Sequence, residues 1–590
     1  MRLKVCLTAA ILLTFSKLFA VPVRPSTFTV VQPDGKRLEL TVIGDETGHM
    51  TVTTDGIAIA EDAGGVWRYA DNVLDGNPVP GRIMAHNPSD RSFAEKLSIS
   101  VSRQREIREE VLCNHSWQTA ATRAAAAPGD YSMTGFNTKG SPRVLVVLVE
   151  FPDLKFTMDS ALILQTYDDI YNHSCVKDSA TYSGIRYERP YGSVRDYFEK
   201  QSYGVFSPSF DIIGPFTASK GYAEYGRNQS GGTSAPHDAN NAMKLVEELC
   251  NTLSLREDIS LDDYDSDGDG YIDMMAVIYA GNGENYSGAD PNTIWPHSWS
   301  LSKRYGEKIR GVKYFLTCEL FWDSRSELDG IGTFCHEFSH VLGLPDLYYT
   351  SYGDDVGNPN FGYWSIMDYG VYENEGFYPV GYTAMERFSL GWLDLEAITR
   401  DSICSLADIN TGNGHAMRLD TDNDHCFFIL ENHNRSGWDK YERASGLMVS
   451  CVSYDSFAWK KNMVNPSADN RRHYLIPADG VSSRKTSGGD MFPYQGNDSI
   501  TVHSVIPITS GDHKPSLGIY GITRDGNGNV TFHASANGTS GIDLPTGNAT
   551  ESDIRIFDLT GREQHYTRES LPRGVWIVCS DGKSVKVSVR

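Results

Sequence analysis

Short apolar or alternating runs, separated by turn residues, recur along most of this 590-residue chain and predict a protein rich in β-structure. Residues 144–149 form a continuous apolar run typical of a buried strand, and residues 274–279 predict another strand. Helices are predicted for the charged stretch at 103–110 and for the segment that contains His336 and His340. The pattern therefore predicts a multidomain α+β protein.

Changes in composition divide the chain into five predicted parts. A basic start, a short apolar run and a small-residue ending are typical of a secretory signal peptide. A polar linker of small residues near 119–129 and another near 536–541 mark two further boundaries. The predicted parts are a signal peptide (1–20), an N-terminal β-rich region (21–131), a catalytic domain (132–395), a β-rich subdomain (396–536) and a β-sandwich-like module (541–590).

The net charge of the chain argues against one class of binding partner. The chain carries a formal charge of −23, and no basic stripe is present that could neutralise phosphates, which argues against a nucleic-acid partner. After the predicted signal, no segment has the roughly 20 apolar residues of a transmembrane helix. We therefore expect a protein that is secreted or held at the outer cell surface without a transmembrane anchor. Ten cysteines show no C-x-x-C pair, so disulfide pairing stays open.

The strongest chemical signal is the run from His336 to Asp346, which reads H-E-F-S-H-V-L-G-L-P-D. His336 and His340 stand at i and i+4, so both imidazoles project from one helix face and can bind one Zn²⁺. Glu337 lies beside the metal and can take a proton from zinc-bound water. A glycine turn at Gly343 brings Asp346 back towards the metal as the expected third ligand. A chance helix with two histidines and an acid is improbable at this spacing, but a degenerate, inactive site remains an alternative.

About 20 residues later the chain reads G-Y-W-S-I-M-D-Y-G, and at this point it resembles the metzincin metallopeptidases. In that group a turn containing methionine lies under the zinc, and Met367 is the matching residue. Tyr369 matches a tyrosine that in some metzincins stabilises the oxyanion, although it is equally well interpreted as a packed aromatic residue. Metzincins usually have histidine as third ligand, whereas this chain has Asp346.

The whole stretch is similar to the immune inhibitor A family of secreted bacterial metallopeptidases, whose motif is H-E-x-x-H-x-x-G-x-x-D. The similarity extends in the same order through residues 144–153, 192–198, 294–297, 390–392 and 428–432. It implies a metzincin-like catalytic domain with a mixed sheet and a zinc-binding helix. It also implies that the N-terminal region is a pro-region. We favour latency maintained by this pro-region until cleavage over a permanent β-domain; Cys113 or a pro-region acid could block the zinc, and the sequence does not choose between them.

An acidic loop upstream of the zinc helix predicts a second kind of metal site. With Asp265 at position 1, Asp267, Asp269 and Asp273 occupy positions 3, 5 and 9 of an EF-hand-type Ca²⁺ loop. Position 12 is Ala276 rather than glutamate, so Asp263 is a candidate for the missing carboxylate. We expect a structural calcium site; the alternative is a solvated acidic turn. The strand after the loop is also expected to be the sheet edge that binds substrate.

One histidine and one cysteine outside the ligand set are expected to be structural. His297 lies beside tryptophan and proline, and Cys335 is expected to point away from the metal. The C-terminal module resembles the sorting domain of bacterial type IX secretion cargo, which implies the secretion machinery as a partner; a β-module without that role is the alternative. The sequence thus predicts a secreted zinc metalloendopeptidase, made as a zymogen, that cleaves extracellular proteins. The competing hypotheses are an inactive adhesin on a peptidase scaffold and a zinc hydrolase of non-peptide substrates.

Overall fold

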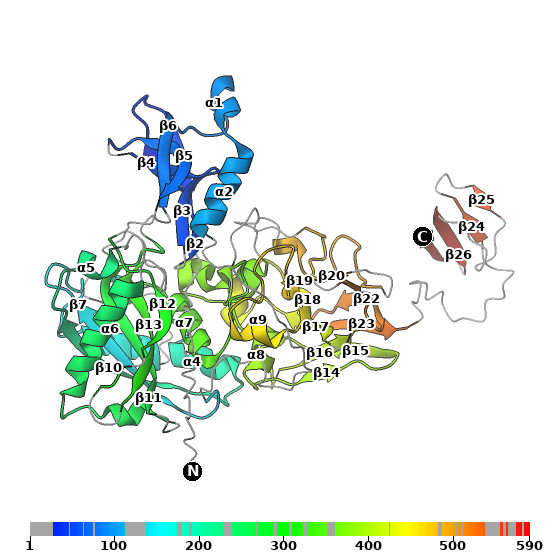
Figure 1. Cartoon of the computed structure of the whole chain (residues 1–590). Helices are drawn as coiled ribbons and strands as arrows, with labels where there is room; N and C mark the ends of the chain where they lie inside the picture. The colour runs from blue at the N-terminus through cyan, green and yellow to red at the C-terminus, as the bar shows by residue number, and fades with distance from the viewer. Residues whose placement is uncertain are drawn as a thin grey trace, which may run out of the picture.

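A five-stranded mixed sheet forms the centre of the catalytic segment in the computed structural model (Figure 1). The structure describes residues 27–112, 137–536 and 555–589 with gaps in each range, the longer ones at 174–179, 228–238, 287–291, 322–326, 351–359, 482–486 and 565–573. The strands run in the order β10-β7-β11-β13-β12. Their bounds are β7 (Arg143–Glu150), β10 (Ser209–Thr217), β11 (Tyr271–Asn282), β12 (His297–Leu301) and β13 (Gly311–Leu320).

Burial explains the strand sequences. Residues 144–149 of β7 are fully buried, as expected for a parallel strand covered on both faces. β7, β10, β11 and β13 pair in parallel, and β12 pairs antiparallel with β13 at one edge. The prediction that residues 276–281 form an edge strand is wrong. This segment belongs to β11, which lies between β7 and β13, because its side chains are apolar on both faces and its burial requires neighbours on both sides.

Two helices of the catalytic segment begin at capping boxes. Ser193 accepts from the Asp196 amide and Asp196 bonds back to Ser193 at the start of α4, and Thr383 and Glu386 form the same capping box in α8. The zinc-motif helix is α7. The helices and short strands of this segment are α3 (Ile163–Asn172), β8 (Ala180–Tyr182), β9 (Ile185–Tyr187), α4 (Val194–Gln201), α5 (Tyr222–Gly226), α6 (Ala239–Ser254), η1 (Leu261–Tyr264), α7 (Gly332–Leu342), η2 (Gly362–Trp364), η3 (Tyr369–Gly376) and α8 (Ala384–Ser389).

The N-terminal region folds as two three-stranded sheets with two helices, so the prediction of short strands and of a helix at 103–110 is confirmed. The first sheet contains β1 (Thr27–Val31), β2 (Arg37–Asp45) and β3 (Gly48–Thr53), and the second β4 (Ile59–Glu61), β5 (Trp67–Leu74) and β6 (Asn77–Met84). The helices are α1 (Phe93–Ser98) and α2 (Val101–Leu112). The predicted signal peptide, the linker at 119–129 and Cys113 lie outside the described residues.

This N-terminal region packs against the catalytic segment close to α7 (Figure 1). Tyr348, two residues after Asp346, belongs to the same buried cluster as Met50, Val52 and Ile107. A second contact joins Val42 of β2 to the buried Trp295. The N-terminal region therefore contacts the chain immediately beyond the zinc motif.

The segment after α8 contains two sheets that share one core. Phe428 and Val449 of the first sheet and Val530 and Phe532 of the second belong to one buried cluster, as in a sandwich. The first sheet has the order β14-β16-β17-β18-β19 and the second β15-β23-β22. The elements are β14 (Leu395–Ala397), β15 (Ser402–Leu406), β16 (Ala416–Asp420), β17 (Cys426–His433), η4 (Gly437–Tyr441), β18 (Gly446–Ser453), α9 (Ser456–Lys460), β19 (His473–Leu475), η5 (Ser487–Gly489), β20 (Ile506–Ile508), β21 (Gly511–His513), β22 (Gly518–Arg524) and β23 (Val530–Ser535).

The C-terminal strands form a single antiparallel sheet in the part of the module that the structure describes. Its strands, in the order β25-β24-β26-β27, are β24 (Arg555–Phe557), β25 (Glu563–Gln564), β26 (Gly574–Ser580) and β27 (Lys583–Val589). Among the described residues of the whole chain, no helix combines the length and apolarity required to cross a membrane.

Candidate metal centre

Helix α7 carries both predicted histidine ligands and ends at the predicted glycine. Gly343 has φ 108°, and its amide donates to the carbonyls of Ser339 and His340. The Leu344 amide also donates to Ser339, which closes the helix as in a Schellman motif. Because only glycine adopts this conformation readily, the chain turns here and returns towards the histidines.

The turn places Asp346 against the two imidazoles. His336 Nε2 and His340 Nε2 lie 3.1 Å apart, and Asp346 Oδ1 lies 3.4 Å from the first and 3.2 Å from the second. In a tetrahedral zinc site with bonds of 2.0–2.1 Å, ligand atoms are separated by about 3.3 Å. The three ligand atoms therefore have the spacing that a zinc ion requires, and all three side chains are buried.

Backbone carbonyls fix the orientation of both rings. His336 Nδ1 lies 2.7 Å from the Ile366 carbonyl oxygen, and His340 Nδ1 lies 2.8 Å from the Leu344 carbonyl oxygen. Each Nδ1–H therefore donates to a carbonyl, which leaves the Nε2 lone pair for a metal. This arrangement suits zinc, since metal-bound histidines usually donate their second N–H in this way.

Asp346 is positioned by a residue that the sequence did not indicate. The Asn462 side chain accepts from the Asp346 amide at 2.7 Å and donates to Asp346 Oδ2 at 2.6 Å. Among the described residues, none donates a hydrogen bond to Asp346 Oδ1, which faces the imidazoles. Burial alone would raise the pKa of Asp346, but the adjacent His340 and His336 outweigh burial and hold the pKa well below its usual range. Asp346 Oδ1 is thus directed at the metal position.

The methionine turn lies directly against the zinc motif. The Met367 carbonyl accepts from the Leu347 amide at 2.8 Å, and the preceding carbonyl of Ile366 holds His336. Met367 is fully buried, and Ser365 donates from its hydroxyl to Glu386 at the start of α8. The turn therefore forms part of the frame that positions His336.

Other predicted residues of the motif are placed as follows. Glu337 is fully buried in α7, next to His336 in the chain. Tyr369 is half-buried at the start of η3, with its ring centroid 6.3 Å from that of Tyr363. Cys335 is buried, as expected. His297 is also buried and lies 2.8 Å from the Trp295 carbonyl oxygen, and burial lowers its pKa to about 4.

The acidic loop before β11 is described in part. Asp267 and Asp269 lie outside the described residues. Asp265 Oδ2 accepts from the Gly270 amide at 2.9 Å, and Asp273 Oδ2 accepts from the Ser266 amide at 2.8 Å. Asp263 pairs with Arg143 at 2.9 Å and is half-exposed. The loop therefore has turn geometry around Asp265 and Asp273, whereas Asp263 is engaged by a cation.

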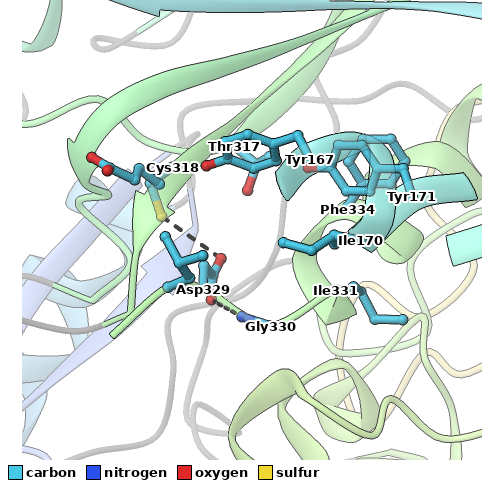
Figure 2. A pocket seen from close by; sticks show the side chains of 11 residues that line it. Tyr167, Ile170, Tyr171, Thr317, Cys318, Asp329, Gly330, Ile331 and Phe334 are labelled. Carbon is cyan, nitrogen blue, oxygen red and sulfur yellow. Dashed lines mark hydrogen bonds between the residues drawn. The ribbon is translucent and has the colours of Figure 1, made fainter. Parts of the chain in front are cut away.

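A small cavity beside the start of α7 is shown in Figure 2, where Tyr167, Tyr171 and Phe334 surround it from one side and Cys318 and Asp329 from the other. Its volume is about 10 Å³, which is about the minimum for one water molecule. Asp329 accepts from the Gly330 amide at 2.9 Å. The cavity is too small to hold a peptide side chain, so it is a packing defect in the core and not a substrate site.

Comparison with known proteins agrees with this geometry. Residues 130–387 match the immune inhibitor A peptidase M6 catalytic domain. This part of the chain is therefore similar to a metallopeptidase domain, and zinc is implied by the matching family and by the His336, His340 and Asp346 cluster.

The chain is also similar to two curated proteins over part of its length. It is similar to the pre-pro-metalloprotease PrtV of Vibrio cholerae serotype O1, with 32% identity over 259 residues, which is 39% of this chain and 27% of that protein. It is also similar to immune inhibitor A of Bacillus thuringiensis subsp. alesti, with 26% identity over 266 residues, which is 39% of this chain and 36% of that protein. The chain thus spans only about a third of the length of these curated relatives.

Proposed function

We propose that the mature protein is a secreted zinc endopeptidase that hydrolyses peptide bonds of extracellular proteins. The observation that carries this proposal is the spacing of the three ligand atoms, 3.1–3.4 Å apart, on a helix and turn that match the M6 peptidase domain. His336, His340 and Asp346 would hold the metal. Zinc bound there would polarise the scissile carbonyl and lower the pKa of a water molecule to about 7.

In the proposed mechanism, Glu337 accepts the proton of the attacking water and transfers it to the leaving amine. Its position in the same helical turn as His336 places the carboxylate beside the ligands rather than among them. Tyr369, which follows the methionine turn, is proposed to donate from its hydroxyl to the oxyanion of the tetrahedral intermediate. Met367 supports the floor of the site without competing for the metal.

We further propose that residues 21–131 keep the enzyme latent until they are cleaved. Support comes from the packing of this region on Tyr348 and Trp295, because Tyr348 lies only two residues from the ligand Asp346. The contact would restrict access of a substrate to the metal. The cut is expected in the small-residue linker near 119–129.

We also propose roles for the acidic loop and for the C-terminal module. The acidic loop with Asp263, Asp265, Asp267, Asp269 and Asp273 is proposed to hold a structural Ca²⁺, which a lower thermal midpoint in EGTA, restored by calcium, would support. Residues 541–590 are proposed to direct type IX secretion. Export that persists after deletion of 554–590 would refute this role.

Chelation tests the central proposal. The trypsin-processed protein is expected to hydrolyse casein, to lose this activity in a zinc chelator and to regain it when zinc is added back. The competing adhesin would bind metal but cleave nothing. Absence of chelator-sensitive casein hydrolysis in the processed protein would contradict the proposal.

A further inference from the structure

A second buried cluster of metal-ligand residues lies in the β-rich subdomain. It contains His433 at the end of β17, Asp439 in η4 and Glu442 just after η4. One ligand atom from each residue lies within 4.8 Å of the others. His433 Nδ1 is 3.2 Å from Glu442 Oε1 and 3.5 Å from Asp439 Oδ2. These separations are close to the ligand spacing of the His336 centre.

The arrangement of His433 is that of a metal ligand supported by a carboxylate. Its Nε2 lies 3.0 Å from Glu431 Oε2, so Nε2–H donates to that carboxylate. This hydrogen bond leaves the Nδ1 lone pair directed at the carboxylates of Asp439 and Glu442. A carboxylate–histidine–metal triad has this geometry.

Glu442 gives an independent indication of a ligand. Its side chain is buried, and neither of its carboxylate oxygens has a hydrogen-bond partner among the described residues. Although Oε1 is 3.2 Å from His433 Nδ1, their geometry is not that of a hydrogen bond. Leaving a buried carboxylate without donors is costly, whereas a metal ion would bind it.

Charge also favours a dication. The carboxylates of Glu431, Asp439 and Glu442 lie in a buried region that also contains Asp408 and, as a cation that acts on Asp439, Arg387. Arg387 donates to Gln201 and Asn410, and Asn410 donates in turn to Asp439 at 2.5 Å. When these acids are ionised, a bound dication would offset their excess negative charge. Protonation of both His433 and Glu442 is the alternative way to neutralise the cluster.

We infer that His433, Asp439 and Glu442 bind a second divalent transition metal ion, with Glu431 orienting His433. An imidazole nitrogen together with carboxylate oxygens suits zinc and related transition metals, whereas calcium prefers oxygen ligands alone. The role of this site is structural and does not depend on the peptidase mechanism.

The cluster connects the β-rich subdomain to the zinc helix. Asp439 accepts from the Gly381 amide at 2.7 Å, and Glu431 accepts from the Ala384 amide at 2.7 Å. Between them, the Tyr382 hydroxyl is hydrogen-bonded to Ser339 of α7. The second metal would therefore brace the segment before α8 against which α7 packs.

Metal content of the purified full-length chain tests the inference. Elemental analysis after dialysis is expected to give two equivalents of transition metal for the wild type and one for the His336→Ala/His340→Ala variant. Adding Glu442→Gln to that variant is expected to remove the remaining equivalent. The matched control, Glu319→Gln, replaces a buried glutamate outside both clusters and is expected to leave the metal content unchanged.

A second measurement does not depend on the Glu442 variant. Adding Co²⁺ to the metal-free His336→Ala/His340→Ala protein is expected to produce visible d–d absorption and to raise the thermal midpoint of unfolding. A wild-type chain with one transition-metal equivalent that disappears in this double variant would overturn the inference. Calcium as the only metal retained by the double variant, with no cobalt spectrum, would overturn it as well. If the wild type binds two equivalents of metal but does not hydrolyse casein, this result would count against the peptidase proposal and not against the second metal site.

Discussion

Asn462 holds Asp346 through two hydrogen bonds, one to the backbone amide and one to the carboxylate, across 116 residues of sequence. The pair leaves Asp346 Oδ1 directed at His336 and His340. Asn462→Ala is therefore expected to weaken zinc binding by about 10- to 100-fold, as the loss of supporting contacts to ligands generally does. Competition with a zinc chelator measures the change. Asn241→Ala, at a buried asparagine of α6 outside both metal clusters, serves as control, and equal zinc affinity in wild type and Asn462→Ala would contradict this role.

Packing of the N-terminal region on Trp295 predicts a variant in which the proposed latency is reduced. Val42→Asp places a charge in the buried contact with Trp295 and is expected to raise the activity of the uncut chain towards that of the trypsin-cut chain. Activity after the cut should not change. Val31→Asp, at an exposed valine of the same region, should have no effect. Uncut Val42→Asp protein with wild-type latency would count against the proposed block.

The hydroxyl of Tyr369 is predicted to act in the transition state. Tyr369→Phe is expected to lower kcat by about 10²- to 10³-fold with little change in KM, which is the usual effect of removing an oxyanion donor. The neighbouring Tyr363→Phe is the matched control, since its ring lies beside that of Tyr369. Steady-state kinetics on a fluorogenic peptide distinguish the two. A packing role for Tyr369 would instead lower stability and leave kcat nearly unchanged.

The free energy of unfolding is expected to decrease as pH rises, because of Asp490. Burial, with a further effect from Asp479, raises the pKa of Asp490 to about 7, although Trp364 donates to its carboxylate at 2.6 Å. An acid whose pKa is raised in the folded state binds more protons folded than unfolded, so stability decreases as pH rises towards 7. Between pH 5 and pH 8 this group costs at most about 3 kcal/mol.

Asp490→Asn removes this titration. Its free energy of unfolding, relative to wild type, is therefore expected to increase between pH 5 and pH 8, as urea unfolding at the two pH values would show. A difference between variant and wild type that does not change with pH would show that Asp490 does not titrate in this range.

Much of the metal centre follows from local sequence. His336, His340, the turn at Gly343 and the return of Asp346 depend on helix periodicity and on one backbone conformation, and the structure brings the three ligands together as predicted. The N-terminal strands and the buried strand at 144–149 were likewise predictable from apolar patterning. These features depend on contacts within a few residues.

Contacts between distant segments could not be predicted in the same way. Asn462 is 116 residues from Asp346, and no pattern in the sequence predicts their contact. The second cluster has a spacing that matches no familiar metal motif, and the apolar residues of β11 did not reveal whether it lies at an edge or at the centre of the sheet. The order of strands in a sheet depends on which strands pair with one another, and the sequence of a single strand carries little information about this pairing.

The most direct test of the proposed zinc peptidase mechanism compares the activity of trypsin-processed wild type and Glu337→Gln on a protein substrate. Zinc content is measured on the same samples. The substitution keeps the size of a fully buried side chain and removes the proposed base. We expect unchanged zinc content and a kcat/KM lower by about 10²- to 10⁴-fold in Glu337→Gln. Full activity of Glu337→Gln, with zinc bound, would contradict the proposed mechanism.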